Sequence, residues 1–200
     1  MGYRKICSFV DVCGTEKDYD LKNEALASKI YELTPKNSLK KPDFRPVLGS
    51  QWFIKIVKHM AAPFRGKVDY VLAPATAGWP WAAAIAAKLN VPMVTVDKTG
   101  SLPYDQKELL SFHGIKYVDY SGKEKMLEVS SSAMVPNSRV LIVDDWTDTG
   151  GAIKACKELV KMFNGTTVAA ITLRSLFSEA QANALMSHFK ENRNPQHEVN

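Results

Sequence analysis

The chain has 200 residues, 46% of them hydrophobic and 24% charged, which suits one large globular domain and excludes a disordered, collagen-like or disulfide-scaffold protein. Its 26 basic residues exceed the 21 acidic ones, but they form no dense lysine and arginine stripe of the kind that binds nucleic acid. The longest apolar stretch, residues 79–87, is far short of the roughly 20 residues that cross a bilayer. We therefore expect no nucleic-acid partner and no membrane partner.

The first 41 residues are predicted to form an accessory segment, followed by the main domain over residues 42–200. Residues 21–33 have the apolar spacing of a helix, and a polar, proline-bounded connector follows them. No apolar leader of the secretory type begins the chain. The odd number of cysteines favours reduced thiols. These features predict a cytoplasmic protein.

From residue 52 onward the apolar pattern alternates between helix and strand. Helices are predicted over residues 52–60, 79–89 and 151–163, and strands over residues 68–73, 91–96, 139–143 and 166–173. This alternation predicts an α/β fold, a mostly parallel sheet flanked by helices.

A polar insert over residues 97–132 interrupts the alternation. Within it, residues 115–120 and 125–129 are predicted to form a hairpin around Ser121 and Gly122. Inserts of this length are commonly lids or binding loops, so we expect a flexible hood; a disordered surface loop is the alternative.

The clearest functional signal follows the predicted strand 139–143. Asp144 and Asp145 come at the carboxyl end of this strand, where open α/β sheets bind ligands. The segment Thr147-Asp-Thr-Gly-Gly then leads into a helix, and its glycines allow a tight turn whose N–H groups and helix dipole can hold a phosphate. The paired acids suit vicinal ribose hydroxyls or a hydrated magnesium ion. The alternative is a capped strand–helix turn with two surface acids.

Residues 140–152 resemble the phosphoribosyl pyrophosphate (PRPP) signature of the type I phosphoribosyltransferases. The resemblance extends over roughly residues 42–175, where four segments follow the order of the adenine branch: Pro42-Asp-Phe-Arg-Pro, Asp69-Tyr-Val-Leu-Ala, Lys98-Thr-Gly-Ser-Leu-Pro and Asp119-Tyr-Ser-Gly. It implies the type I fold with its hood, a homodimer, Mg²⁺ as cofactor, and transfer of ribose 5-phosphate from PRPP to a nucleobase with release of pyrophosphate.

The resemblance also implies roles for individual residues. Asp144 and Asp145 would hold the ribose hydroxyls and the magnesium ion. The phosphate of the ribose would be bound by Thr147, Asp148, Thr149, Gly150 and Gly151. The pyrophosphate loop would be Ala75, Thr76, Ala77 and Gly78, with Lys98 neutralising the leaving group. The Phe44 ring would stack on a purine, beside Arg45.

Proton handling at the base is predicted to be catalysed by Asp148, with Asp119 on the hood as the second candidate. A purine that attacks through N9 must lose or relocate an imidazole proton, which a nearby carboxylate can accept. Asp148 lies in the phosphate loop, whereas Asp119 would arrive only when a hood closes. Two simpler roles are open: Asp148 could cap the following helix, and Asp119 could be a solvated hairpin acid.

Three positions depart from the adenine branch and leave the base open. Ala77 stands where that branch usually has Arg, Asp148 where it has Ala, and Ala152 where it has a hydroxyl residue. Asp148 resembles the hypoxanthine–guanine branch, and Thr76-Ala-Gly-Trp-Pro resembles the orotate enzymes. We predict a purine phosphoribosyltransferase of nucleotide salvage, with adenine the first candidate. The alternatives are another base, such as hypoxanthine, guanine or orotate, and a catalytically weak regulator that senses PRPP or nucleotides.

Overall fold

The computed structural model describes residues 9–10, 24–34, 42–101, 112–119 and 121–175. Their strands form one sheet in the order β1-β7-β6-β2-β3-β5-β4. The strands are β1 (Phe9–Val10), β2 (Tyr70–Pro74), β3 (Met93–Lys98), β4 (Phe112–Val118), β5 (Glu124–Ser130), β6 (Arg139–Thr147) and β7 (Thr166–Ser175). Strands β7, β6, β2 and β3 run parallel, while β1, β5 and β4 pair antiparallel with their neighbours. The predicted α/β fold with a mostly parallel sheet is confirmed.

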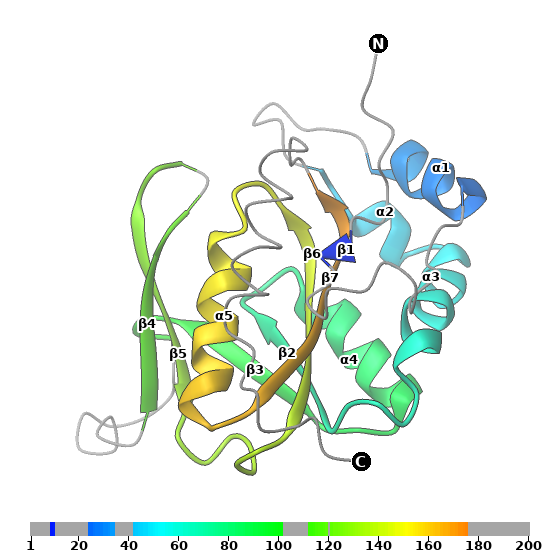
Figure 1. The fold of residues 1–200 in the computed structure, drawn as a ribbon. Helices are drawn as coiled ribbons and strands as arrows, with labels where there is room; N and C mark the ends of the chain where they lie inside the picture. Colours follow the sequence, from blue (N-terminus) through cyan, green and yellow to red (C-terminus); the bar gives the residue numbers. More distant parts are fainter. Residues whose placement is uncertain (1–8, 11–23, 35–41, 102–111, 120, 176–200) are drawn as a thin grey trace.

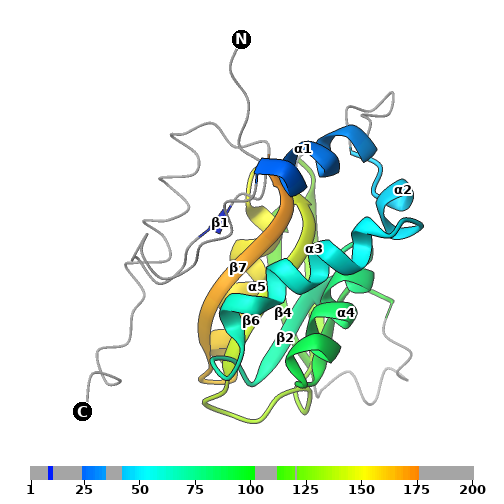
Figure 2. The ribbon, with the colours of Figure 1, turned by 90° about the vertical axis from the view of Figure 1, so that its right-hand side faces the viewer.

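Helices cover both faces of the sheet (Figures 1 and 2). Helices α3 (Trp52–Ala61) and α4 (Trp79–Leu89) lie on one face, and α5 (Gly151–Met162) lies on the other. The apolar run of β6 serves both faces, because successive side chains of a strand point to opposite sides. Leu141 and Val143 join the core under α3 and α4, whereas Val140 and Ile142 join the core under α5.

The short helices lie at the α3 side of the molecule. They are α1 (Glu24–Leu33), α2 (Arg45–Leu48) and the 3₁₀ helix η1 (Ala62–Phe64). Leu26 and Ile30 of α1 are buried in the same cluster as α3 and α4, so the described part of the first 41 residues packs within the main core. None of the helices described here is long and apolar enough to cross a membrane.

The predicted helix over residues 79–89 has the observed bounds of α4, and α3 and α5 differ from prediction by one residue at their ends. Strand β3 begins at Met93 and not at residue 91, since Pro92 has no N–H to give to a ladder. Strand β6 runs on to Thr147, four residues past its predicted end, because β7 continues beside it as far as Ser175. Asp144 and Asp145 therefore lie inside a paired strand and not just beyond one.

The predicted hairpin is confirmed, and it consists of β4 and β5. Its register runs from Phe112↔Ser130 to Val118↔Glu124. Strand β5 joins the parallel sheet through the pairs Asp97↔Glu128 and Lys98↔Leu127. The hairpin stands beside α5 in Figure 1. That it moves as a hood stays a prediction.

Candidate functional site

The candidate site lies at the edge of the sheet where the parallel strands end. Strand β2 leads into residues 75–78 and then α4, β3 ends at Lys98, and β6 leads into residues 148–150 and then α5. Because β2 lies between β6 and β3 in the sheet, the segments that follow these three strands are neighbours. The fold thus assembles the predicted pyrophosphate loop, Lys98 and the acid-pair segment at one edge.

The pyrophosphate loop packs directly on Asp144. A Cβ added to Gly78 would lie 2.8 Å from Oδ1 of Asp144 and 3.1 Å from its Cα, so only glycine fits this approach. Oδ1 of Asp144 also accepts a hydrogen bond from the Asp145 N–H, at 2.9 Å. Two of the predicted subsites are therefore in contact. The loop carries one further feature, a cis peptide bond between Ala75 and Thr76.

The acid pair is largely buried: Asp145 is 7% exposed and Asp144 is half-buried. Burial raises the pKa of Asp144 well above its usual range, and so do the charge and side-chain hydrogen bond of Asp145; the Asp145 N–H and the Lys98 cation oppose the rise. Burial also raises the pKa of Asp145, against hydrogen bonds from Asp144 and from backbone N–H groups.

This donor set fits a magnesium ion. Carboxylate oxygens are its preferred protein ligands, and a cation relieves the repulsion between two desolvated acids. Among the described residues no cluster of three or more His, Cys, Asp or Glu side chains could complete an all-protein site. A magnesium ion held by one or two carboxylates together with substrate phosphates agrees with this arrangement.

The turn between β6 and α5 has the geometry of an anion site. Gly150 occupies the N-cap with φ +76°, a left-handed conformation that favours glycine. The N-cap residue Gly150 has no side chain to cap the helix, and no hydrogen bond from the helix to Asp148 is observed in the described part of the chain, so the capping alternative for Asp148 is not observed. Thr149 Oγ1 accepts the Gly151 N–H at 3.4 Å. Thr147 and Gly150 are buried, Asp148 is half-buried and Thr149 is exposed.

The carboxyl end of β4 rests on this turn. A Cβ on Gly151 would lie 2.5 Å from the Val118 carbonyl oxygen and 3.2 Å from Cδ2 of the Tyr117 ring. A cavity of about 380 Å³ lies between β4 and α5, and Tyr117, Thr149 and Lys154 are among the residues that line it. Burial raises the pKa of Tyr117, with smaller contributions from the charges of Asp119, Cys156 and Asp144. Nothing in the sequence singles out Tyr117, because a lone tyrosine in a strand is commonly a core residue.

Asp119 closes the hairpin turn. Its Oδ1 accepts hydrogen bonds from the Ser121 hydroxyl at 2.6 Å, the Ser121 N–H at 2.8 Å and the Lys123 N–H at 3.1 Å. The Ser121 side-chain bond is the main reason that the pKa of Asp119 is lowered. The structure therefore gives this carboxylate a local role in the turn, and its part in catalysis stays a prediction.

The structure buries the Phe44 ring, and its stacking on a base stays a prediction. Phe44 is only 6% exposed and packs edge-on against Trp81 in the core, with ring centroids 6.3 Å apart. Its neighbour Arg45 points outward and forms a bidentate pair with Asp43, at 2.9 and 2.7 Å. Adjacent apolar and basic residues do not reveal which side chain faces the core, and here the aromatic one does.

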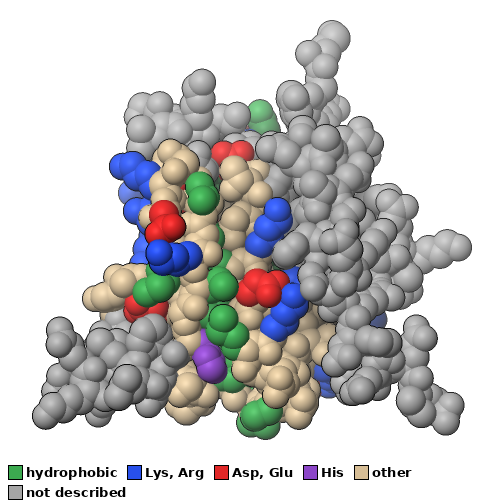
Figure 3. Space-filling model, turned by 60° about the vertical axis from the view of Figure 1, so that its left-hand side comes forward, with side chains coloured by type: hydrophobic (Ala, Val, Ile, Leu, Met, Phe, Trp, Pro, Cys, Tyr) green, Lys and Arg blue, Asp and Glu red, His purple; other side chains and the backbone are tan. Residues whose placement is uncertain are grey.

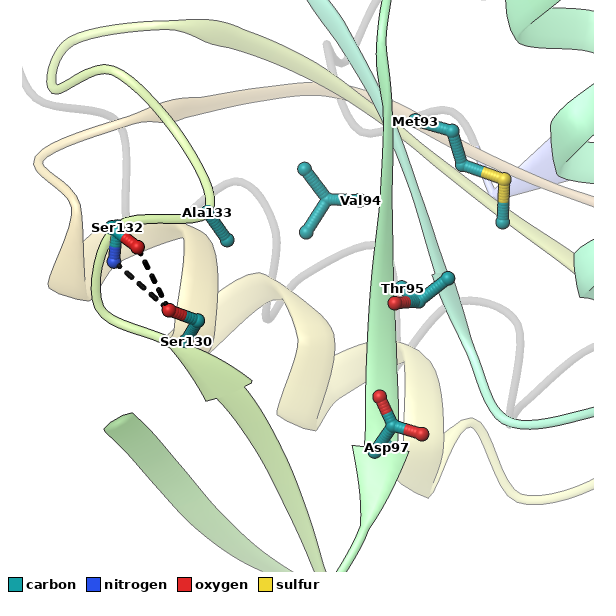
Figure 4. A pocket seen from close by; sticks show the side chains of 7 residues that line it. All are labelled: Met93, Val94, Thr95, Asp97, Ser130, Ser132 and Ala133. Carbon is teal, nitrogen blue, oxygen red and sulfur yellow. Dashed lines mark hydrogen bonds between the residues drawn. The ribbon is translucent and has the colours of Figure 1, made fainter. Parts of the chain in front are cut away.

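A second cavity, of about 300 Å³, lies away from the acid pair (Figure 4). It opens where β5 diverges from β3, and its walls include Thr95, Asp97, Ser130 and Ser132. Burial and the nearby charge of Glu128 raise the pKa of Asp97. None of the predicted site residues lines this cavity.

The face seen in Figure 3 carries basic and acidic side chains interspersed among apolar ones, with no large patch of one sign on its described part. The hairpin carries the ion pair Lys116–Glu124 at 2.9 Å, and α5 carries the ion pair Lys161–Glu158 at 2.8 Å.

Comparison with known proteins finds related sequences and structures. A family model described as a phosphoribosyl transferase domain matches residues 50–186. The chain is 35% identical over 144 residues to an adenine phosphoribosyltransferase of Thermoanaerobacter sp., covering 71% of this chain and 79% of that protein. It is 30% identical over 122 residues to one of Campylobacter hominis, covering 60% and 64%. The crystal structure of adenine phosphoribosyltransferase from Thermoanaerobacter pseudethanolicus has a TM-score of 0.63 at 26% identity, covering 74% of this chain and 99% of that one.

Proposed function

Because the chain belongs to the phosphoribosyl transferase family, we propose that it transfers ribose 5-phosphate from PRPP to a purine base and releases pyrophosphate. The observation that carries the proposal is the contact between Gly78 and Asp144. It joins a loop suited to pyrophosphate to an acid pair suited to ribose hydroxyls. The turn at Gly150 follows β6, the neighbour of β2 in the sheet, and it is suited to the phosphate of the ribose.

PRPP then lies along the edge of the sheet, with each charged part at its own subsite. Asp144 and Asp145 accept hydrogen bonds from the ribose hydroxyls. The N–H groups of the first turn of α5, whose N-cap residue Gly150 has no side chain, bind the phosphate of the ribose. Residues 75–78 and Lys98 bind the pyrophosphate. Asp144 and Asp145 would hold a magnesium ion, which would neutralise the charge that the leaving group gains.

The reaction is a displacement at the anomeric carbon with oxocarbenium character. Lys98 and the N–H groups of the 75–78 loop stabilise negative charge as the bond to pyrophosphate breaks, and preorganised donors of this kind are a large source of catalysis. Asp148 accepts the imidazole proton of the attacking purine. Asp119 is the weaker candidate, because its Oδ1 is engaged by three donors in the hairpin turn and its pKa is lowered. Asp148 lies in the short connection between β6 and α5, beside the proposed phosphate site.

Adenine is the first candidate base, supported by the names of the relatives. Ala77 and Asp148 keep hypoxanthine and guanine as further candidates. The same Ala77 favours the second candidate function, a sensor that binds PRPP and turns over slowly, because it removes a cation from the pyrophosphate loop. We also propose that the enzyme acts as a homodimer, which light scattering after size exclusion tests.

The experiment is release of pyrophosphate from PRPP and Mg²⁺ with adenine, hypoxanthine, guanine, xanthine, uracil and orotate in parallel. We expect release with one purine, and loss of ~1–3 kcal/mol of PRPP binding in Asp144→Asn and Asp145→Asn, the scale of charge-assisted hydrogen bonds. Asp43→Asn, which changes a surface acid away from the acid pair, is the control. Binding of PRPP without release for any base would identify a sensor. Unchanged affinity in both acid-pair variants would remove the assigned site.

A further inference from the structure

Strand β7 carries a buried hydroxyl beside the acid pair. Thr172 is 2% exposed, and its Oγ1 has no hydrogen-bond partner among the described residues. Its register partner in the parallel ladder is Asp144. Register partners place their side chains on the same face of a sheet, on strands about 4.8 Å apart.

The two side chains share the face that α5 covers. Ile142, two residues before Asp144, and Ala170, two residues before Thr172, both belong to the cluster under α5. Cys156 of α5 is buried in the same cluster, and the charge of Asp144 adds to the burial that raises the pKa of its thiol. Of the residues placed on this face above, Asp144 is the one that carries a strong hydrogen-bond acceptor.

A buried hydroxyl without a partner is an exception that calls for one, since buried polar groups in proteins nearly always form hydrogen bonds. Asp144 is the register partner of Thr172 and carries a strong acceptor. Its Oδ1 takes the Asp145 N–H. The structure shows no hydrogen bond between Thr172 and Asp144, so donation requires a change of side-chain rotamer at one of the two residues.

We propose that Thr172 is a positioning residue for the PRPP site: in the PRPP complex its hydroxyl donates a hydrogen bond to the Asp144 carboxylate and holds that carboxylate in the orientation that receives the ribose. The inference rests on the proposed function, which makes Asp144 a ribose ligand. Thr172 itself touches no substrate. Its effect is on how well Asp144 binds PRPP and not on the base.

The chain provides a matched control on the same strand. Thr167 also has a buried Oγ1 with no partner among the described residues, but its register partner is the apolar Val140, at the opposite end of β6. Thr→Val at either position replaces one hydroxyl by a methyl group of nearly the same shape. Since neither hydroxyl has a hydrogen bond to lose within the described fold, both variants are expected to fold.

The experiment is calorimetric titration of PRPP with Mg²⁺ and without base, for wild type, Thr172→Val, Thr172→Ser and Thr167→Val, followed by steady-state kinetics. We expect Thr172→Val to weaken PRPP binding about tenfold, the loss of one hydrogen bond to a charged group. Thr172→Ser should bind within about twofold of wild type, because the hydroxyl is retained, and Thr167→Val should bind as wild type does. The KM for the base should not change, while the KM for PRPP rises in Thr172→Val.

Three outcomes overturn the inference: wild-type affinity in Thr172→Val, equal losses in Thr172→Val and Thr167→Val, or a loss in Thr172→Ser as large as in Thr172→Val. In each of these the wild type binds PRPP and the proposed function stands. A wild-type protein that binds no PRPP overturns the proposed function and this inference together.

Discussion

Arg174 and Thr34, 140 positions apart in the chain, are joined by two buried hydrogen bonds. Nη1 of Arg174 donates to the Thr34 carbonyl oxygen at 2.9 Å and to its hydroxyl at 3.1 Å. The guanidinium carbon also lies 4.7 Å from the centre of the Tyr31 ring. Thr34 directly follows α1, so a cation of β7 binds the carbonyl end of this helix, the end that favours positive charge. The register partner of Arg174 is Trp146, which directly follows the acid pair in β6. The contact between Arg174 and Thr34 therefore attaches the end of α1 close to the acid pair.

Replacing Arg174 with methionine should lower the free energy of unfolding by about 2–3 kcal/mol, because a buried carbonyl and hydroxyl lose a charged donor. Urea unfolding measures the change. Arg139→Met is the control: Arg139 pairs with Asp69 at 2.8 Å, but about half of its side chain is exposed, and exposed pairs contribute about 1 kcal/mol or less. Equal losses in the two variants would contradict a special role for the Arg174 contact.

The acid pair predicts a pH dependence of stability. Burial raises the pKa of both Asp144 and Asp145 in the fold, so the folded protein retains protons that the unfolded chain has lost. Their contribution to stability is fully present below the ordinary pKa of 3.8 and is lost as pH rises through the raised values. Asp144→Asn cannot ionise. Its stability relative to wild type should therefore increase from about pH 4 to about pH 7, in urea unfolding without magnesium or PRPP.

Asp43 provides the opposite sign for this test. Its hydrogen bonds with Arg45 lower its pKa to about 2, so its ionised form favours the fold, and that contribution is lost as pH falls toward 2. Asp43→Asn should lose rather than gain relative stability as pH rises, by a small amount at this exposed site. A stability difference for Asp144→Asn that is constant with pH would show that the pair ionises without cost.

Gly78→Ala should weaken PRPP binding and reduce stability by about 1–3 kcal/mol, the usual cost of overpacking. The new Cβ would meet the Cα of Asp144 at 3.1 Å and the Val143 carbonyl oxygen at 3.3 Å, and neither backbone atom can rotate away. Gly49→Ala is the matched control, since its nearest contact would be 3.7 Å. Thermal unfolding and PRPP titration test both variants. If the two behave alike, the approach of the loop to Asp144 does not constrain residue 78.

Turnover at saturating PRPP distinguishes the two carboxylates, Asp148 and Asp119, that are candidates for accepting the purine proton. Asp148→Asn should lower kcat about 100-fold, the scale of general-base catalysis. Asp119→Asn should retain most of the turnover, because an amide oxygen can still accept the hydrogen bonds of the hairpin turn. A full rate in Asp148→Asn together with a large loss in Asp119→Asn would move the proton chemistry to the hairpin.

Local signals predicted the elements around the site well. Helix α4 is bounded by Pro80 in its first turn and by Asn90, which adopts φ 58° as its C-cap, and both residues are readable in the sequence. The acids and glycines of residues 144–151 could likewise be recognised without a structure.

Relationships that depend on packing could not be predicted. The burial of Phe44 depends on Trp81 lying across from it. The pairing of Thr172 with Asp144 depends on a register that shifts at an irregularity between Val140 and Leu141. No count along the sequence shows that shift.

The junction between β5 and β3 gives the hairpin a fulcrum. The two strands pair at Asp97↔Glu128 and Lys98↔Leu127, midway along β5, so the hairpin is attached beside Lys98. If the hairpin moves as the predicted hood, a rotation about this junction would carry Asp119, in the turn, farther than Lys98. Access to a base bound at the proposed site would then change while Lys98 stays near Asp144.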